Sequence, residues 1–212
     1  MPIIFQQQLS AGAKLALWEI TEALSFFEQY EVEARSIAHP AVKKQHLAAR
    51  VALLFLAPHF PLDKLINNAA GKPHLENKDW YISFSHTTDL AAAIFSPVQE
   101  VGIDVERVGE RIFRVSYKFL SEQEKACLQL ATQLNTLQES DAAAKWLTLC
   151  WSAKESLYKW KGMPGIDFIK DMKLISVEPA NSQLLFEVSC YEKPIRVAYK
   201  CWDTYVLTWV HE

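Results

Sequence analysis

Apolar side chains that recur every three to four positions in the first part of the chain predict a region rich in helix. Residues 14–20 (KLALWEI) fit either a strand or the beginning of a helix, and residues 21–38 fit a helix. A second helix is predicted over residues 41–56, where apolar side chains recur on one side. Pro58 and Pro61 follow this run, so the helix should end before them.

Three short runs in the middle of the chain have the character of strands. Residues 80–85 (WYISFS), 90–95 (LAAAIF) and 101–105 (VGIDV) are rich in apolar, β-branched and aromatic side chains. The four residues between the first two runs, HTTD at 86–89, suit a tight connection. This part of the chain is therefore predicted to be β-structure.

The second half repeats this plan of helices followed by strands. Ser121 and Glu124 match the capping box S-x-x-E, which predicts a helix from residue 121 to about residue 130. A longer helix is predicted from about residue 140 to Lys161, with Gly162 as its C-terminal cap. The β-rich runs that close the chain are residues 172–177, 184–189, 195–202 and 205–210.

Both halves contain helices and a few strands, which places the chain in the α+β class. Residues 96–109 are the natural seam, so we expect two similar-sized subdomains, residues 1–100 and residues 101–212. A chain of 212 residues, half of them apolar and 22% charged, is long enough to bury a core and to fold as a globular protein.

Charge and composition narrow the class of protein. The 22 basic and 25 acidic residues give a net charge of -3, which argues against a nucleic-acid-binding protein. The four cysteines form no C-x-x-C pair and are too sparse for a disulfide scaffold. The N-terminal MPIIFQQQ lacks the features of a signal peptide, and the longest apolar stretch, residues 51–58, is too short to span a membrane. We therefore expect a cytoplasmic protein without a membrane segment.

The first candidate for chemistry is VGIDVE, residues 101–106. In a strand, Asp104 and Glu106 lie on the same face about 7 Å apart. Two carboxylates at this spacing suit a hard divalent cation such as Mg²⁺. Two solvated acids at the exposed end of a strand would give the same pattern, so the pattern by itself leaves both interpretations open.

The second candidate is WSAKESLYK, residues 151–159. In a helix, Glu155 and Lys159 lie one turn apart on the same side as Trp151. Glu155 could supply a third carboxylate to a metal ion, while Lys154 and Lys159 could hold phosphate oxygens. The alternative is an ordinary glutamate–lysine pair on a solvated face.

Two shorter motifs precede these candidates along the chain. In FSHT, residues 84–87, the histidine can donate to a phosphate, and the serine and threonine can add hydroxyl or backbone contacts. In GKP, residues 71–73, the glycine allows a turn and the proline stiffens it, so that the lysine is presented on a rigid loop. A structural histidine and a turn with a solvated lysine are the respective alternatives.

In this order and at these separations, the four motifs resemble the 4′-phosphopantetheinyl transferases of the Sfp type. The resemblance covers residues 71–159, and G-I-D-x-E together with W-x-x-K-E-x-x-x-K makes it specific. It implies a pseudo-dimer of two α+β halves with the active site in the cleft between them. It also implies a holo-[acyl-carrier-protein] synthase, which moves the phosphopantetheine arm of coenzyme A to a carrier-protein serine and releases adenosine 3′,5′-bisphosphate.

The resemblance assigns the chemistry to four residues. Asp104, Glu106 and Glu155 correspond to ligands of Mg²⁺, with Mn²⁺ as the alternative metal. Glu155 also corresponds to the group that accepts the serine proton, directly or through water. Lys159 corresponds to the residue that contacts the pyrophosphate and stabilises developing charge. These four residues are therefore the expected catalytic and metal-binding groups.

The resemblance also assigns residues to coenzyme A, with His86 at a phosphate. The full set is Lys44, Gly71, Lys72, Pro73, Ser85, His86, Thr87, Asp104, Lys154 and Lys159. Lys43 and Arg50 remain alternatives to Lys44 as the partner of the 3′-phosphate, because the register of the second helix is open.

The implied partner is an apo acyl carrier protein or a peptidyl carrier domain. Residues 111–119 (RIFRVSYKF) carry three basic and three aromatic side chains and are the candidate contact for its acidic helix. An ordinary amphipathic connector is the alternative. A pseudo-dimer within one chain makes a monomer the expected state. The rival functions are a Mg²⁺-dependent hydrolase of coenzyme A and a non-catalytic protein that binds coenzyme A.

Overall fold

The computed structural model describes residues 3–30, 37–77, 79–137 and 140–212, and the chain divides into two compact units. Unit 1 comprises Met1–Val105, Lys159–Gly162 and His211–Glu212, and unit 2 comprises Glu106–Tyr158 and Met163–Val210. Strand β7 (Val101–Arg107) and helix α5 (Asp141–Lys161) each contribute residues to both units. The expected subdomains, residues 1–100 and 101–212, stay a prediction.

Unit 1 contains a four-stranded antiparallel sheet with the strand order β1-β2-β6-β5. Its strands are β1 (Ile3–Gln8), β2 (Lys14–Glu19), β5 (Tyr81–His86) and β6 (Leu90–Ser96). The first of the two alternatives for residues 14–20, a strand, is therefore correct. Strands β5 and β6 confirm the two runs predicted on either side of the HTTD turn. Strand β1 was not predicted from the sequence.

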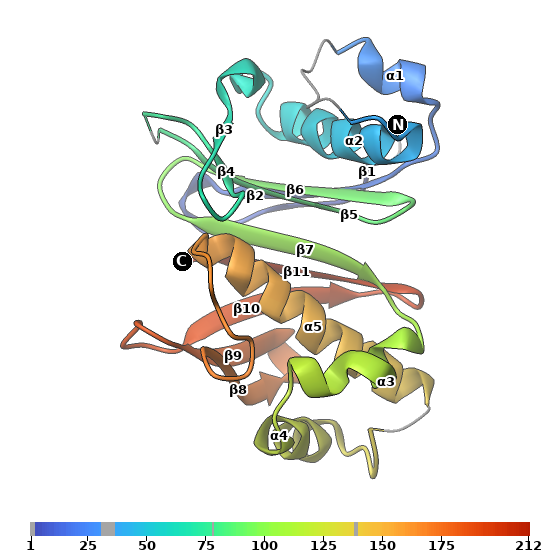
Figure 1. Cartoon of the computed structure of the whole chain (residues 1–212), viewed down its shortest axis with the longest axis vertical. Coiled ribbons are helices and arrows are strands. Elements are labelled where there is room, and N and C mark those ends of the chain that lie inside the picture. Colours follow the sequence, from blue (N-terminus) through green and yellow to red (C-terminus); the bar gives the residue numbers. More distant parts are fainter. Residues whose placement is uncertain (1–2, 31–36, 78, 138–139) are drawn as a thin grey trace. The chain divides into compact units, whose positions relative to one another are not determined.

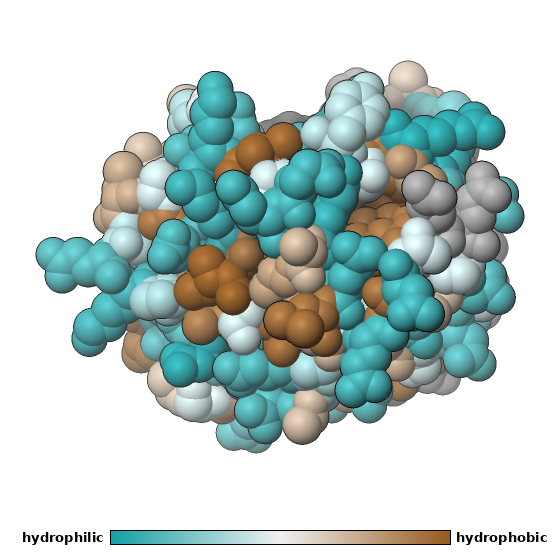
Figure 2. Space-filling model, turned by 90° about the horizontal axis from the view of Figure 1, so that it is seen from below, coloured by the Kyte–Doolittle hydropathy of each residue, from teal (hydrophilic) through white to brown (hydrophobic). Residues whose placement is uncertain are grey.

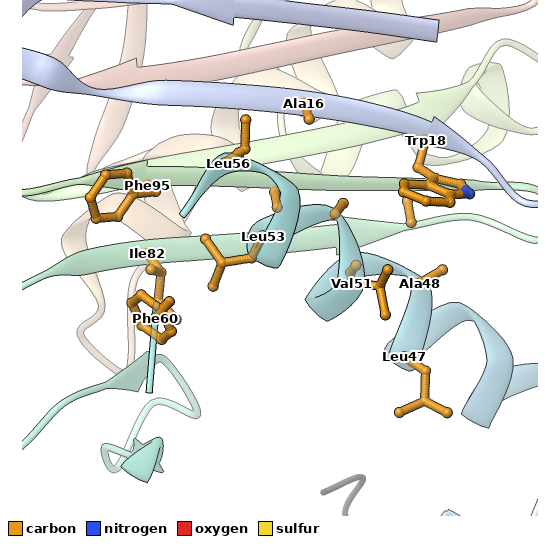
Figure 3. Packing of buried hydrophobic residues seen from close by; sticks show 14 of the residues in the cluster. Ala16, Trp18, Leu47, Ala48, Val51, Leu53, Leu56, Phe60, Ile82 and Phe95 are labelled. Atoms are coloured by element: carbon orange, nitrogen blue, oxygen red, sulfur yellow. The ribbon is translucent and has the colours of Figure 1, made fainter. Parts of the chain in front are cut away.

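Helix α2 (Pro40–Leu56) covers one face of this sheet (Figure 1). Proline fits the first turn because its missing N–H would have no helical partner there. Side chains of α2 such as Leu53 and Leu56 share one buried cluster with strand residues such as Trp18, Ile82 and Phe95 (Figure 3). These side chains are buried and form the hydrophobic core of unit 1.

The predicted helix over residues 21–38 is only partly present. Helix α1 spans Leu24–Glu28, and residues 31–36 lie outside the described part of the chain. Two very short strands, β3 (Ile66–Asn67) and β4 (Pro73–His74), pair with each other and bracket the turn at Gly71. Within the described residues, 3-10 turns span Ser10–Gly12, Leu62–Lys64, Ser116–Lys118 and Pro179–Asn181.

The second sheet has the strand order β7-β11-β10-β9-β8. The four strands after β7 are β8 (Met172–Glu178), β9 (Gln183–Val188), β10 (Ile195–Cys201) and β11 (Tyr205–His211). The pairs β8–β9, β9–β10 and β10–β11 are antiparallel. All four runs predicted at the end of the chain are therefore confirmed, with small shifts at their ends.

Three helices accompany this sheet: α3 (Arg111–Val115), α4 (Glu122–Thr132) and α5. The capping box is confirmed, because Ser121 Oγ accepts from the Glu124 N–H at 3.3 Å and the Glu124 carboxylate accepts from the Ser121 N–H at 2.8 Å. Helix α4 packs against β8. Helix α5 ends at Lys161, and Gly162 follows with φ +61°, as expected of a helix cap.

The architecture confirms the α+β class predicted from the sequence. On the face drawn in Figure 2, hydrophilic side chains surround a few groups of apolar ones. Leu130 of α4 is the most exposed of the large apolar side chains described, at 84%. No helix in the described ranges combines the length and apolar character that crossing a membrane requires.

Candidate active site

Asp104 of strand β7 is buried and has two carboxylate oxygens in different environments. Oδ1 accepts hydrogen bonds from Lys159 Nζ at 2.7 Å and from Ser85 Oγ at 2.8 Å. Oδ2 is also buried but has no hydrogen-bond partner among the described residues. Buried polar atoms are nearly always paired, because an unpaired one loses its hydration without compensation. The free oxygen of Asp104 therefore indicates a ligand position.

Lys159 lies near the C-terminal end of helix α5 and belongs, like Asp104, to unit 1. Its side chain is 26% exposed, whereas that of Asp104 is 4% exposed. The pair is thus open on the lysine side. An ammonium group with exposed surface keeps the freedom to donate to an incoming anion.

His86 ends strand β5 and lies in an electropositive environment. Burial of the ring, followed by the charges of Lys159 and Arg50, lowers the pKa of His86 below its ordinary value. The Arg50 guanidinium lies over the ring of Phe84, 5.1 Å from its centroid. His86 is therefore neutral near pH 7, and the two neighbouring cations favour an anion beside it.

The three basic candidates on α2 differ in their surroundings. Lys43 Nζ forms an ion pair with Glu28 at 2.5 Å. The charge of Arg50 acts on His86, and its NH1 donates to the carbonyl oxygen of His46 at 3.1 Å. The Lys44 side chain has no hydrogen bond or ion pair within the described part of the chain. Of these three candidates, Arg50 is the one whose charge acts on His86.

The GKP loop is held against the end of α5 by its own lysine. Lys72 Nζ donates to Glu100 at 2.5 Å and to the carbonyl oxygen of Trp160 at 2.6 Å. Burial lowers the pKa of Lys72, and the bond to Glu100 opposes this shift. A Cβ at Gly162 would lie 2.6 Å from Lys72 Cδ, so a side chain there would displace Lys72. Lys72, which the resemblance assigned to coenzyme A, therefore holds the GKP loop against α5 through these hydrogen bonds.

The same loop borders a cavity of about 210 Å³ in unit 1. The cavity is lined by Asn68, Lys72, Pro73, His74, Trp80, Tyr81, Ile82 and Glu100. Aromatic rings and a proline give it apolar walls, while the amide and carboxylate side chains supply polar contacts. Apolar walls with a few polar groups are typical of a site for a small molecule.

Thr87 shapes the turn between β5 and β6. Its Oγ1 accepts from the Leu90 N–H and donates to Asp89 Oδ1, both at 3.1 Å. Its backbone N–H donates to the Leu90 carbonyl oxygen at 2.8 Å. The hydroxyl and the N–H of Thr87 are therefore engaged within the turn.

Glu106 and Trp151 are linked within unit 2. The indole Nε1–H of Trp151 donates to Glu106 Oε1 at 3.0 Å. The indole ring packs against Phe119 and Phe168, with centroid distances of 5.2 and 5.5 Å. A ring held on two sides is a rigid donor, so Trp151 fixes one oxygen of Glu106. The sequence placed Trp151 beside Glu155 on the helix but gave no signal of this bond.

Lys154 is placed in a sealed ion pair instead of an open site. Its Nζ donates to Glu124 Oε1 at 2.5 Å and to the carbonyl oxygens of Phe119 and Phe168 at 2.6 and 2.8 Å. The side chain is 0% exposed, and its three N–H groups have three acceptors. Lys154 therefore joins α4, α5 and the segment at Phe168. Its expected contact with coenzyme A stays a prediction.

The three carboxylates expected at a metal ion are divided between the units, with Asp104 in unit 1 and Glu106 and Glu155 in unit 2. No group of three or more metal-ligating side chains gathers within the residues that the structure describes. The chemistry of the individual residues nevertheless fits a hard cation, because Asp104 Oδ2 is a buried carboxylate oxygen without a partner.

A groove of about 640 Å³ lies beside helix α3 in unit 2. It is lined by Glu110, Arg111, Phe113, Arg114, Ser140, Asp141 and Ala144. Two arginines and a phenylalanine from the segment RIFRVSYKF therefore border one open groove together with residues at the beginning of α5.

Comparison with known families points to one of them. The family model described as ACPS: 4′-phosphopantetheinyl transferase superfamily matches residues 100–210, just over half of the chain. The matched region contains all of β7 and α5 and therefore Asp104, Glu106, Glu155 and Lys159. No curated protein matches the chain significantly.

Proposed function

The chain belongs to the 4′-phosphopantetheinyl transferase superfamily, and we propose that it is a holo-[acyl-carrier-protein] synthase of the Sfp type. It transfers the phosphopantetheine arm of coenzyme A to a serine of an apo acyl carrier protein or peptidyl carrier domain. The serine oxygen forms a bond to the β-phosphorus of the pyrophosphate. The bond from that phosphorus to the bridging oxygen breaks, and adenosine 3′,5′-bisphosphate leaves.

The observation that carries this proposal is the unpartnered Oδ2 of Asp104 beside Lys159. A carboxylate oxygen can bind a metal cation, and an ammonium group can donate to the phosphate oxygens of a pyrophosphate. Together the two groups suit a complex of a metal ion with pyrophosphate. We assign Asp104, Glu106 and Glu155 as the ligands of Mg²⁺, with Mn²⁺ as the alternative. When bound, the metal ion offsets negative charge on the pyrophosphate.

The chain's own residues supply the remaining chemistry. Lys159 donates to the pyrophosphate and stabilises the charge that develops on the leaving bisphosphate. Glu155 accepts the proton of the carrier serine, which raises the nucleophilicity of the serine oxygen. Both residues lie on α5, one turn apart, so a single rigid helix presents the two groups.

We assign the rest of coenzyme A to two sites in unit 1. The adenine occupies the cavity beside the GKP loop, whose apolar walls suit a flat base. His86 and Arg50 bind the 3′-phosphate, since the positive charge of Arg50 already acts on His86. Arg50 thereby replaces Lys44 as the favoured residue of α2. The expected cleft between two pseudo-symmetric halves stays a prediction.

We assign the carrier protein to the groove beside α3. Arg111 and Arg114 provide positive charge for an acidic helix, and Phe113 provides apolar contact area. Charge attraction of this kind mainly accelerates encounter, so its contribution should weaken as the salt concentration rises.

The proposal is tested by incubating the protein with an apo acyl carrier protein, coenzyme A and Mg²⁺ and measuring the intact mass of the carrier. A gain of one phosphopantetheine arm, absent in Asp104→Ala and Glu155→Ala, supports the transferase. An unmodified carrier, despite measurable binding of coenzyme A and trials with several carriers, contradicts it. Consumption of coenzyme A without transfer would instead identify a hydrolase, and binding without either reaction a non-catalytic binding protein.

A further inference from the structure

Two buried serines of strand β5 connect this edge strand to β7 in different ways. Ser83 Oγ accepts a hydrogen bond from the backbone N–H of Ile103 at 3.2 Å. Ser85 Oγ donates at 2.8 Å to the carboxylate of Asp104, which follows Ile103 in β7. The exposed fractions are 3% for Ser83 and 7% for Ser85. The first serine thus holds the backbone of β7, and the second holds its functional side chain.

The direction of the Ser85 bond follows from the chemistry of its partner. An ionised carboxylate has no proton to donate, so the Ser85 hydroxyl must be the donor. This bond and the bond from Lys159 both end on Oδ1. Two donors on one oxygen fix the rotation of the carboxylate and leave Oδ2 as the oxygen without a partner.

We propose that Ser85 is a positioning residue of the metal site, which orients Asp104 so that Oδ2 faces the cation. This inference rests on the proposed function, in which Asp104 binds the metal. It gives Ser85 a different task from the one that the sequence resemblance implied, which was a contact with a phosphate of coenzyme A.

Ser85 is needed because the other donor to Oδ1 has a second task. In the proposed reaction, Lys159 donates to the pyrophosphate, so its bond to Asp104 weakens when coenzyme A is bound. The Ser85 hydroxyl is buried, uncharged and held by the strand, so it stays on Oδ1. An uncharged donor also leaves the negative charge of the carboxylate available to the cation. Partners of this kind, which orient a metal ligand, typically change metal affinity by about 10- to 100-fold when removed.

The test compares Mn²⁺ binding by the wild type, Ser85→Ala and the matched control Ser83→Ala. Free Mn²⁺ is measured by electron paramagnetic resonance with saturating coenzyme A and without a carrier, so that no turnover occurs, and a blank without protein corrects for Mn²⁺ bound by coenzyme A alone. We expect Ser85→Ala to weaken binding at least about tenfold. Ser83→Ala should bind within about twofold of the wild type, since its lost bond involves only backbone.

A kinetic measurement separates positioning of the metal ligand from contact with coenzyme A. For Ser85→Ala, the Mg²⁺ concentration that half-activates transfer should rise about tenfold, while kcat at saturating Mg²⁺ and KM for coenzyme A stay within about threefold. Unchanged Mn²⁺ affinity together with a raised KM for coenzyme A would overturn the proposal and restore Ser85 to the phosphate site.

A second variant covers the case in which Ser85→Ala does not fold. Ser85→Cys has nearly the same shape and a much weaker donor, so it should weaken Mn²⁺ binding several-fold with a normal thermal midpoint. Wild-type affinity in this folded variant would contradict the inference. Failure of the proposed function looks different: the wild type would bind Mn²⁺ with coenzyme A but leave every carrier unmodified, and the effect of Ser85 on binding would still be measurable.

Discussion

Helix α5 contributes the lysines of two lysine–carboxylate ion pairs, which differ in exposure and in the other hydrogen bonds of the carboxylate. Lys154 and Glu124 are 0% and 3% exposed, whereas Lys159 and Asp104 are 26% and 4% exposed. The first pair lies in unit 2, and the second lies in unit 1. Two residues from one helix, five positions apart, therefore have one sealed and one open environment.

The hydrogen bonds of the two carboxylates make the contrast sharper. Glu124 Oε1 accepts from Lys154 and from the Leu174 N–H at 2.9 Å, and Oε2 accepts from the Ser121 N–H and hydroxyl at 2.8 and 2.9 Å. Asp104 uses only Oδ1, and its Oδ2 is left without a partner among the described residues. The saturated pair joins elements of the fold, and the unsaturated pair has capacity for a ligand. The two pairs thus differ in the number of acceptor positions that are left for a ligand.

The largest expected effect comes from changing the open pair. Asp104→Asn should reduce transfer by about a thousandfold or more, because the amide is a poor ligand for a hard cation. The thermal midpoint should stay within about 4 °C of the wild type, since the change removes a buried charge with an unpaired oxygen. Intact-mass assays of the carrier and thermal unfolding measure the two quantities. A variant that transfers normally would show that Asp104 is not a metal ligand.

The sealed pair should respond in the opposite way. Lys154→Met leaves the Glu124 carboxylate buried without its cation, which should lower the free energy of unfolding by about 3–5 kcal/mol. Urea unfolding followed by tryptophan fluorescence measures this change. Lys125→Met is the matched control, since Lys125 forms an exposed pair with Glu122 on α4 that should contribute less than about 1 kcal/mol. Equal stability of the two variants would refute the structural role.

A smaller effect is expected where Trp151 holds Glu106. Trp151→Phe keeps an aromatic ring between Phe119 and Phe168 but removes the N–H donor to Glu106 Oε1. The Mg²⁺ concentration for half-activation should rise about fivefold, with kcat at saturating Mg²⁺ nearly unchanged. Trp146→Phe, on the same helix, should leave both values as in the wild type. A fall in kcat without a change in Mg²⁺ dependence would assign Trp151 a different role.

The smallest expected effect concerns the pH dependence of coenzyme A binding. The pKa of His86 is lowered from its ordinary value of 6.5, so the free protein carries a neutral ring near pH 7. A bound phosphate raises the pKa of the ring, so binding takes up a proton and tightens as the pH falls from the pKa in the complex toward the lower pKa of the free protein. Between pH 7.5 and 6, the Kd for coenzyme A should fall about threefold more in the wild type than in His86→Asn.

Calorimetry with both proteins measures this difference. Ionisation of the ligand's own phosphate affects both proteins equally and cancels in the comparison. 3′-Dephospho-coenzyme A is the control ligand and should show no difference between them. Parallel pH profiles of the wild type and His86→Asn with coenzyme A would place the phosphate away from His86.

Local pattern was sufficient for most of the secondary structure. The capping box at Ser121 and Glu124, the long helix ended by Gly162 and the terminal strands are all present as predicted. These features depend on contacts between residues close in sequence, which a single sequence displays directly. The helix predicted over residues 21–38 is the main exception, because only Leu24–Glu28 forms α1 within the described part of that range.

The candidate site was predictable in its residue types but not in the partner of each residue. The motifs identified Asp104, Glu106, Glu155 and Lys159, which all lie within the matched family region. They did not reveal that Ser85 donates to Asp104 or that Lys72 bonds to Glu100. These pairs are 19 and 28 residues apart, so their contacts depend on tertiary packing and not on any local spacing.

The sequence by itself determined most of the helices and strands, which carboxylates and lysines occur in the motifs, and the family to which the chain belongs. The tertiary structure decided which partners several of these charged groups have. Lys154 and Lys159 are about 140° apart around the axis of a helix with 3.6 residues per turn, so they must face different surroundings. Helix α4 and the segment at Phe168 pack over the face of α5 that carries Lys154, which makes this lysine structural. Asp104 lies at the face that carries Lys159, and this lysine is left available to a ligand.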